Sequence, residues 1–94
     1  MYVVVRSYSE QGASALFDLL AQREGDVRAL IGGVPGFVSY AAFRSGDGGT
    51  TVTICQDKAG TDESSRRAAE WVKENVSTTV DPPAVTEGTT VLHF

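Results

Sequence analysis

Residues 34–57 read Val34-Pro-Gly-Phe-Val-Ser-Tyr-Ala-Ala-Phe-Arg-Ser-Gly-Asp-Gly-Gly-Thr-Thr-Val-Thr-Ile-Cys-Gln-Asp57, and this stretch predicts how the chain folds. Two runs rich in β-branched and aromatic residues flank Ser45-Gly-Asp-Gly-Gly49, whose glycines supply the positive-φ positions of a tight reversal. The stretch therefore predicts a β-hairpin. Alternation along the first strand predicts one face formed by Phe37, Ser39, Ala41 and Phe43. Because neither strand alternates cleanly between apolar and polar residues, we expect both faces of the hairpin to be covered.

A strand and a helix are predicted before the hairpin. Tyr2–Tyr8 contains three consecutive valines, which favour a pleated and packed setting. Apolar residues then recur at helical spacing, so a long helix is predicted from Ser9 or Gln11 to about Ile31. Ser9 is its expected N-cap, and Gly25-Asp26 allows a bend or a split.

A second helix and a last strand are predicted after the hairpin. The helix spans about Thr61–Val76, with Asp57 as a possible N-cap and Trp71 at the edge of its buried stripe. We expect that stripe to contain Ser65, Ala68, Ala69, Val72 and Val76. Asp81-Pro82-Pro83 predicts an extended connector, and Thr89–Phe94 is the predicted final strand.

The element order is therefore β-α-β-β-α-β over a single domain, residues 1–94. This order predicts an α+β ferredoxin-like fold, in which a four-stranded antiparallel sheet carries two helices on one face. The other face would expose Phe37, Phe43 and several valines to water, a larger apolar patch than monomers usually carry. We therefore expect a two-fold homodimer that covers this face with a second subunit.

Composition excludes some classes of partner. The net charge is −4 with a sequence pI of about 4.7, and the eight basic residues are scattered, so nucleic-acid binding is not expected. No run of 18 apolar residues suggests a membrane span, which predicts a cytoplasmic protein. Cys55 is the single cysteine and cannot form an internal disulfide, which is consistent with a reducing compartment.

Two stretches resemble a known superfamily. Val34-Pro-Gly-Phe-Val-Ser-Tyr40 and Ala68-Ala-Glu-Trp-Val-Lys-Glu-Asn75, together with the topology, resemble the dimeric α/β-barrel superfamily, which includes the antibiotic-biosynthesis monooxygenase domains. In topology the resemblance covers nearly the whole chain. It implies that the open sheet faces of two subunits form a barrel. It also implies a small-molecule cavity between the sheet and the helices of each subunit.

Few residues have the chemistry of a catalytic group. His93 is the only histidine, so any Ser-His-Asp or Cys-His scheme would need it; the alternative is a polar residue in a terminal strand. Cys55 is either a thiolate nucleophile or a buried, inert thiol. No zinc ligand set and no Gly-rich phosphate motif occurs, so neither a metal nor a cofactor is expected. Arg66-Arg67 is either an anion site or a solvated helix face.

Trp71 and Asn75 are four residues apart and therefore share a helical face. The resemblance implies that such Asn, Trp and Tyr side chains hold an enolisable aromatic substrate while dioxygen reacts with it, without metal or flavin. The chain departs from the family pattern, because Thr53 and Cys55 occupy third-strand positions where the monooxygenase-like domains often have Glu and Trp. Trp71 as plain packing at the helix edge remains the alternative.

Two functions follow from these observations. The first is a homodimer with a small-molecule cavity, which acts as a cofactor-independent monooxygenase on an aromatic substrate. Its expected wall consists of Phe37, Ser39, Ala41, Phe43, Thr51, Thr53 and Cys55, and its expected donors are Tyr40, Asn75 and His93. The alternative is a non-catalytic interaction or regulatory module, because this topology supports many functions. A cavity reaching Trp71, Asn75 or His93 would favour the first function.

Overall fold

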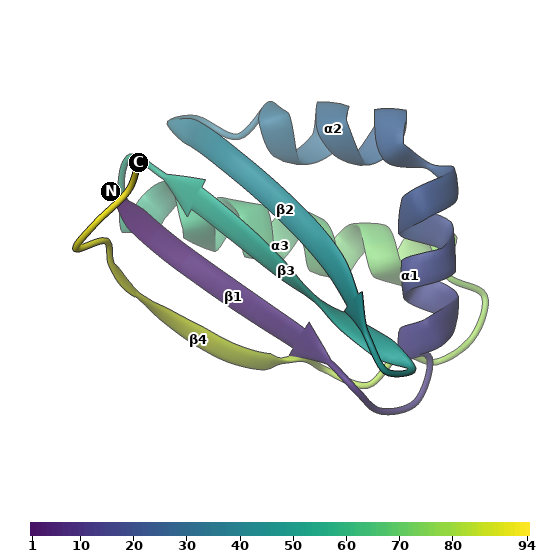
Figure 1. Ribbon diagram of the computed structural model, residues 1–94. Coiled ribbons are helices and arrows are strands. Elements are labelled where there is room, and N and C mark those ends of the chain that lie inside the picture. Colours follow the sequence, from purple (N-terminus) through teal and green to yellow (C-terminus); the bar gives the residue numbers. More distant parts are fainter.

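A computed structural model describes residues 1–94, with seven elements in chain order. They are β1 (Tyr2–Tyr8), α1 (Ala13–Gln22), α2 (Glu24–Gly32), β2 (Phe37–Ser45), β3 (Gly48–Cys55), α3 (Lys58–Asn75) and β4 (Ala84–Thr89). The strands form one four-stranded antiparallel sheet of order β2-β3-β1-β4, and the helices lie against one of its faces (Figure 1). The predicted ferredoxin-like α+β fold is confirmed.

The central hairpin forms as predicted, but its first strand contains a bulge. The register changes between Phe37 and Ser39, so that Phe37 lies opposite Cys55 and Tyr40 lies opposite Thr53. Because side chains alternate across a strand, the extra residue moves Phe37 to the same side as Tyr40. The predicted face of Phe37, Ser39, Ala41 and Phe43 is therefore wrong for Phe37, which packs toward the helices.

The predicted long helix is two helices. The chain leaves helical geometry at Arg23, with φ −113° and ψ 36°, rather than at Gly25. The predicted N-cap Ser9 is also wrong, because α1 begins after Gly12, whose φ is 82°. A Cβ on Gly12 would overlap the Thr79 backbone, so contact with a distant connector decides where the helix starts.

Helix α3 begins with the predicted cap, since the Asp57 carboxylate accepts a hydrogen bond from the Gly60 backbone N–H at 3.1 Å. Its buried face differs from the predicted stripe. Trp71 is 9% exposed and belongs to the central core, whereas Ala69 is exposed. At Gly60 the helix lies so close to β3 that a Cβ would sit 2.8 Å from that of Cys55.

The last strand occupies a different segment from the predicted Thr89–Phe94. Strand β4 pairs with β1 from Ala84 to Thr89, directly after the predicted Asp81–Pro83 connector. The pairing ends there because Tyr2, the partner of Thr89, is the first residue of β1. The residues after Thr90 form an exposed apolar tail, in which Val91 is 92% exposed.

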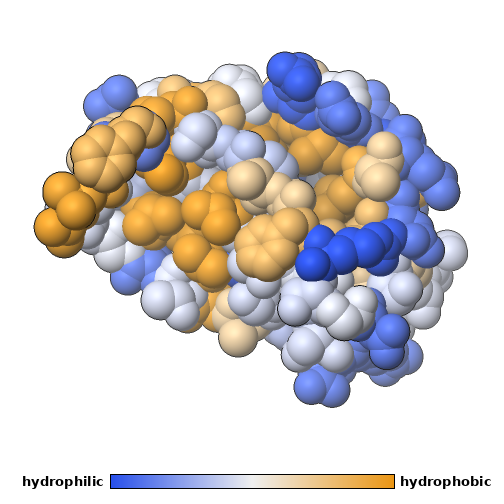
Figure 2. All heavy atoms as spheres, in the orientation of Figure 1, coloured by the Kyte–Doolittle hydropathy of each residue, from blue (hydrophilic) through white to orange (hydrophobic).

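The two faces of the sheet differ in chemistry. The covered face, toward the helices, carries Val4, Arg6, Tyr8, Thr51, Thr53 and Cys55, all of them buried. The open face carries Val3, Val5, Val52 and Ile54, which are only half-buried. Figure 2 views the open face and shows apolar side chains across its centre. None of the helices combines the length and the apolar composition needed to cross a bilayer.

Candidate functional site

A cleft of about 680 Å³ lies between the edge strand β2 and helices α1 and α2. Its lining is mainly apolar, and its aromatic side chains are Phe17, Phe37, Tyr40 and Phe43. The cleft forms here because β2 has no strand on its outer side and because the chain turns at Arg23, between α1 and α2. A mostly apolar cleft of this kind suits a flat ligand that makes few hydrogen bonds.

The rim of the cleft is charged, but its charges are already paired. Arg28 donates to Glu24 at 3.3 Å within α2, and Arg44 of β2 donates to Asp18 of α1. Exposed pairs of this kind contribute little free energy and exchange readily with solvent. We therefore expect a ligand to be recognised by residues in the interior of the cleft and not by the paired charges at its rim.

The cleft contains some of the predicted ligand-binding residues. Phe37, Tyr40 and Phe43 line it, and Phe43 is 53% exposed at its opening. Ser39 and Ala41 line it as well, and the register places both of them, together with Phe43, on the side of β2 opposite to Phe37 and Tyr40. The cleft therefore wraps around the edge strand, instead of resting on one face of the sheet as the sequence interpretation assumed.

Other predicted residues lie outside the lining of this cleft. Trp71 packs in the core with the Arg23 guanidinium 5.9 Å from its ring centroid, and the Asn75 side-chain amide donates to the Trp71 carbonyl at 2.9 Å. Thr53 and Cys55 are buried under α3. His93 lies in the exposed tail at the opposite end of the sheet from α1 (Figure 1). Their participation in binding stays a prediction.

Cys55 is poorly suited to act as a nucleophile, for electrostatic reasons. Its side chain is fully buried, and burial raises the pKa of the thiol, an effect to which the Asp57 charge adds. A thiol with a raised pKa carries little thiolate at neutral pH. Cys55 therefore fits the inert alternative of the two that its sequence position allowed.

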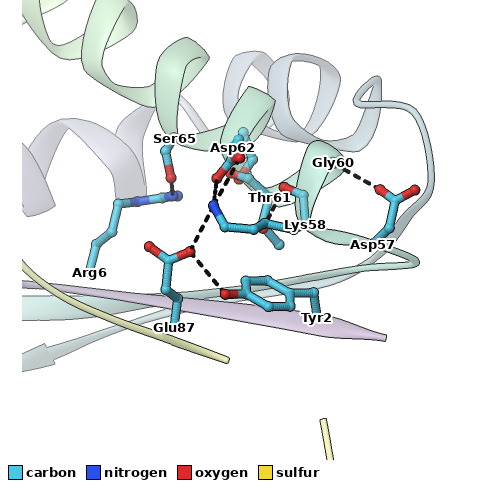
Figure 3. A network of polar contacts seen from close by, with 10 residues as sticks. Tyr2, Arg6, Asp57, Lys58, Gly60, Thr61, Asp62, Ser65 and Glu87 are labelled. Atoms are coloured by element: carbon cyan, nitrogen blue, oxygen red, sulfur yellow. Dashed lines mark hydrogen bonds and ion pairs between the residues drawn. The ribbon is translucent and has the colours of Figure 1, made fainter. Parts of the chain in front are cut away.

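A polar cluster lies beside the cleft, under the sheet. We call Arg6, Tyr8, Tyr40, Thr51, Thr53 and Ser65 the Arg6 cluster. The Arg6 guanidinium donates to Ser65 Oγ at 2.8 Å and to Thr53 Oγ1 at 3.3 Å, so it bridges β1, β3 and α3; Figure 3 shows its bond to Ser65. Arg6 is only 4% exposed, and its Nε has no hydrogen-bond partner.

No carboxylate accompanies this buried charge. The other arginines, at positions 23, 28, 44, 66 and 67, each pair with an Asp or Glu. The acidic side chains that Figure 3 shows near Arg6, Asp62 and Glu87, are instead paired with Lys58. Arg6 is thus a buried cation satisfied in part by hydroxyl groups.

The tyrosines of the cluster remain protonated donors. Burial raises the pKa of Tyr40, and the Arg6 charge opposes that rise. Burial likewise raises the pKa of Tyr8, again against the influence of Arg6. Both hydroxyls therefore lie close enough to Arg6 to sense its charge, and both can donate a hydrogen bond at neutral pH.

Sequence reasoning missed Arg6 and Thr51 as partners in a polar site. The signal was present, because alternation puts Arg6 between Val4 and Tyr8 on one face of a strand rich in valine. An arginine flanked in this way on a covered face must find polar partners, since burial of a lone charge is costly.

Comparison with solved structures identifies the fold. A protein of unknown function from Nitrosomonas europaea matches with a TM-score of 0.70 and 20% identity, covering 99% of this chain and 90% of that chain. A monooxygenase from the ActVA-Orf6 gene of Streptomyces coelicolor, solved with nanaomycin D, matches with a TM-score of 0.66 and 22% identity, covering 99% and 89%. The cofactor-independent oxygenase SnoaB from Streptomyces nogalater, solved as a mutant, matches with a TM-score of 0.58 and 16% identity, covering 98% and 94%. The chain shares their fold.

This agreement confirms the fold that the sequence resemblance implies. No protein-family model matches the chain, and no curated protein matches it in sequence. The activities of the neighbours are theirs, because similar folds at such low identity carry different chemistries. Any function must therefore be argued from this chain's own cleft and cluster.

Proposed function

We propose that this chain is a homodimeric small-molecule-binding protein that oxygenates an aromatic substrate without a cofactor. The observation that carries the proposal is the cleft, because 10 of its 15 lining residues are hydrophobic and its inner wall includes Tyr40. A flat ring system would stack against Phe37, while Tyr40, on the same side of β2, donates a hydrogen bond to a ring oxygen.

The oxygenase step rests on what such a site does to an enolisable ring. The ring C–H₂ group of the deprotonated substrate gives up four electrons to O₂ in all; one oxygen atom becomes the new carbonyl, and the other leaves as water with the two hydrogens of that group. Donors in a water-poor site favour the enolate form, which is the form that reacts. The Streptomyces neighbours, which are described as a monooxygenase and a cofactor-independent oxygenase, support this chemistry for the fold.

The homodimer is proposed from the open face of the sheet. Val3, Val5, Val52 and Ile54 form an apolar surface that no helix of the chain covers. A second copy related by a two-fold axis would bury this surface on both chains, and an obligate interface would total on the order of 2,000 Å². Light scattering should then report a particle of twice the 10.0 kDa chain mass. A 10.0 kDa particle at micromolar concentration contradicts the dimer.

A non-catalytic binding protein is the second candidate. It is favoured by the location of Trp71, Asn75 and His93, since none of these expected donors lines the cleft. A protein that only sequesters or senses a ligand needs the cleft but no reacting groups. The two candidates therefore agree on binding and differ on turnover.

The test separates binding from turnover. Calorimetric titration with a panel of polycyclic phenols measures binding, and an oxygen electrode measures O₂ consumption with the same compounds. Ala21→Trp should fill the cleft from an exposed position of α1, and Ala29→Trp, on exposed α2 surface outside the lining, is the matched control. We expect Ala21→Trp to lose both signals and Ala29→Trp to retain them. Binding without oxygen uptake would establish the non-catalytic candidate, and no binding at all would refute both.

A further inference from the structure

The starting point is the unbalanced charge of Arg6. Its guanidinium is 4% exposed and has no carboxylate partner, although its hydrogen bonds to Thr53 and Ser65 fix its position. Removing a charge from water without an opposite charge costs several kcal/mol, even after the surroundings relax. A methionine at position 6 would fill the same space without a buried charge. Packing therefore does not explain why the residue is an arginine.

Two buried polar atoms in this region lack partners, and they belong to neighbouring residues. Arg6 Nε and Thr51 Oγ1 have no hydrogen bond, and the register places Arg6 directly opposite Thr51 on the covered face. Both groups can donate, and facing side chains on paired strands are within contact distance of each other. An oxygen acceptor between them would satisfy both atoms at once.

The residues paired across β1, β3 and β2 at this level of the sheet lead from Arg6 to the cleft. Thr51 is paired on its other side with Ala42, and Thr53 is paired with Tyr40; both Ala42 and Tyr40 line the cleft. Two strand spacings, about 10 Å, therefore separate the backbone of Arg6 on β1 from β2 at the cleft wall, and Tyr40 is the one member of the Arg6 cluster that lines the cleft. Tyr40 borders the cleft and also senses the charge of Arg6.

We propose that the Arg6 cluster is an oxyanion-binding subsite at the inner end of the cleft, so that the ligand is an aromatic compound carrying an ionised oxygen. The Arg6 Nε–H and the Thr51 hydroxyl donate to that oxygen, and Tyr40 lies at its point of access. The ligand's charge then balances the buried cation, which the chain's own residues leave unbalanced. A phenolate and an aromatic carboxylate share this chemistry.

This inference rests on ligand binding in the cleft but not on oxygenase activity. A neutral aromatic ring would occupy the apolar part of the cleft and leave the cluster unpaired. An aromatic anion would occupy both. The preference for the anion over its neutral counterpart is therefore the quantity to measure.

The probe is 4-nitro-1-naphthol, whose anion absorbs visible light, and the neutral control is its methyl ether. Wild-type protein is compared with Arg6→Met, which removes the charge, with Arg6→Lys, which retains it, and with Arg66→Met, a matched change at a surface arginine. We expect wild type to lower the apparent pKa of the bound probe by about one unit or more, which corresponds to about tenfold preference for the anion. That shift should vanish in Arg6→Met, while binding of the ether is unchanged and Arg66→Met behaves as wild type.

The other outcomes also support or overturn the oxyanion-binding subsite. Equal binding of anion and ether by wild type, or an unchanged shift in folded Arg6→Met, overturns the subsite. If Arg6→Met does not fold, the wild-type preference and its retention in Arg6→Lys carry the test. Titration with 2-naphthoate distinguishes the two sources, because the tighter of carboxylate and phenolate identifies the group that the cluster takes. Failure of both anion and ether to bind refutes the cleft proposal itself, whereas anion binding without oxygen uptake refutes only the oxygenase.

Discussion

The covered and the open face of the sheet differ in the polar residues that they carry. The covered face, under the helices, holds a charged residue and two threonines, Arg6, Thr51 and Thr53, whereas the open face holds Val3, Val5, Val52 and Ile54. A monomeric antiparallel sheet usually packs its apolar face against helices and turns its polar face to water. This contrast motivates both proposals, a second subunit on the open face and a polar ligand beside the covered one.

A similar contrast separates the arginines of the two regions. Arg66 lies on the outer surface of α3 between Glu63 and Glu70, at 2.7 and 2.8 Å, and its charge is balanced by its neighbours along the helix. Arg67 also pairs with Glu63 and donates to the Leu30 carbonyl at 3.0 Å. These pairs favour the solvated-face interpretation of Arg66-Arg67 over an anion site. Among the arginines, only Arg6 has a charge that no carboxylate of the chain balances.

The largest expected effect comes from charging the open face. Val5→Asp would place an unpaired carboxylate at the centre of the proposed interface, which costs about 3–5 kcal/mol when the charge remains buried. We expect loss of the dimer by light scattering together with a lowered melting temperature. Lys73→Asp, on an exposed position of α3, should preserve the dimer. If Val5→Asp forms a normal dimer, the open face is not the interface.

The next largest effect is expected at the contact between α3 and β3 on the covered face, where Gly60 lies against Cys55. In Gly60→Ala the new Cβ would lie 2.8 Å from Cys55 Cβ and 2.9 Å from the Pro35 carbonyl oxygen, so α3 must shift away from β3. Overpacking of this kind typically costs about 1–3 kcal/mol, which denaturant unfolding would measure. Gly25→Ala, where a Cβ meets nothing within 4 Å, is the control and should be neutral or stabilising.

Replacement of Arg6 should have a smaller effect on stability, and the effect should be neutral or stabilising. Arg6→Met removes a buried charge that has no carboxylate partner, and the desolvation cost saved offsets the lost bonds to Ser65 and Thr53. We therefore expect a melting temperature equal to or above that of wild type, measured without ligand. A large decrease would show that Arg6 acts mainly as a structural bridge, and the contrast between the two faces would lose its functional meaning.

The smallest effect concerns the balanced charges on α3. Hydrogen bonds from Arg66 and then Arg67 lower the pKa of Glu63 to about 2. A carboxylate with a lowered folded-state pKa stabilises the protein above its ordinary pKa and loses that contribution as the pH falls toward 2. Glu63→Gln should therefore flatten the decrease in melting temperature between about pH 4.5 and 2, with little change at pH 7 beyond a small offset. An unchanged acid profile would contradict the assignment.

The hairpin and the first strand were predictable because their signals are local. Three valines in Tyr2–Tyr8, the glycines around Asp47, and the cap at Asp57 act within a few residues of themselves, and each was found where expected. The element order then led to the fold, since this order has few compact solutions. The apolar open face also followed from counting two helices against two faces.

Tertiary contacts decided the rest. Helix α1 starts at Ala13 because Gly12 lies against Thr79, far along the chain, and β4 ends at Thr89 because its partner strand ends at Tyr2. A single bulge after Phe37 moved one aromatic side chain to the covered face, and the unpaired outer side of β2 placed the cleft at the edge of the sheet. The sequence by itself determined the order of strands and helical segments and that one sheet face is apolar. Only the packed structure decided that Arg6 is buried without a carboxylate, because that depends on where every distant acidic side chain lies.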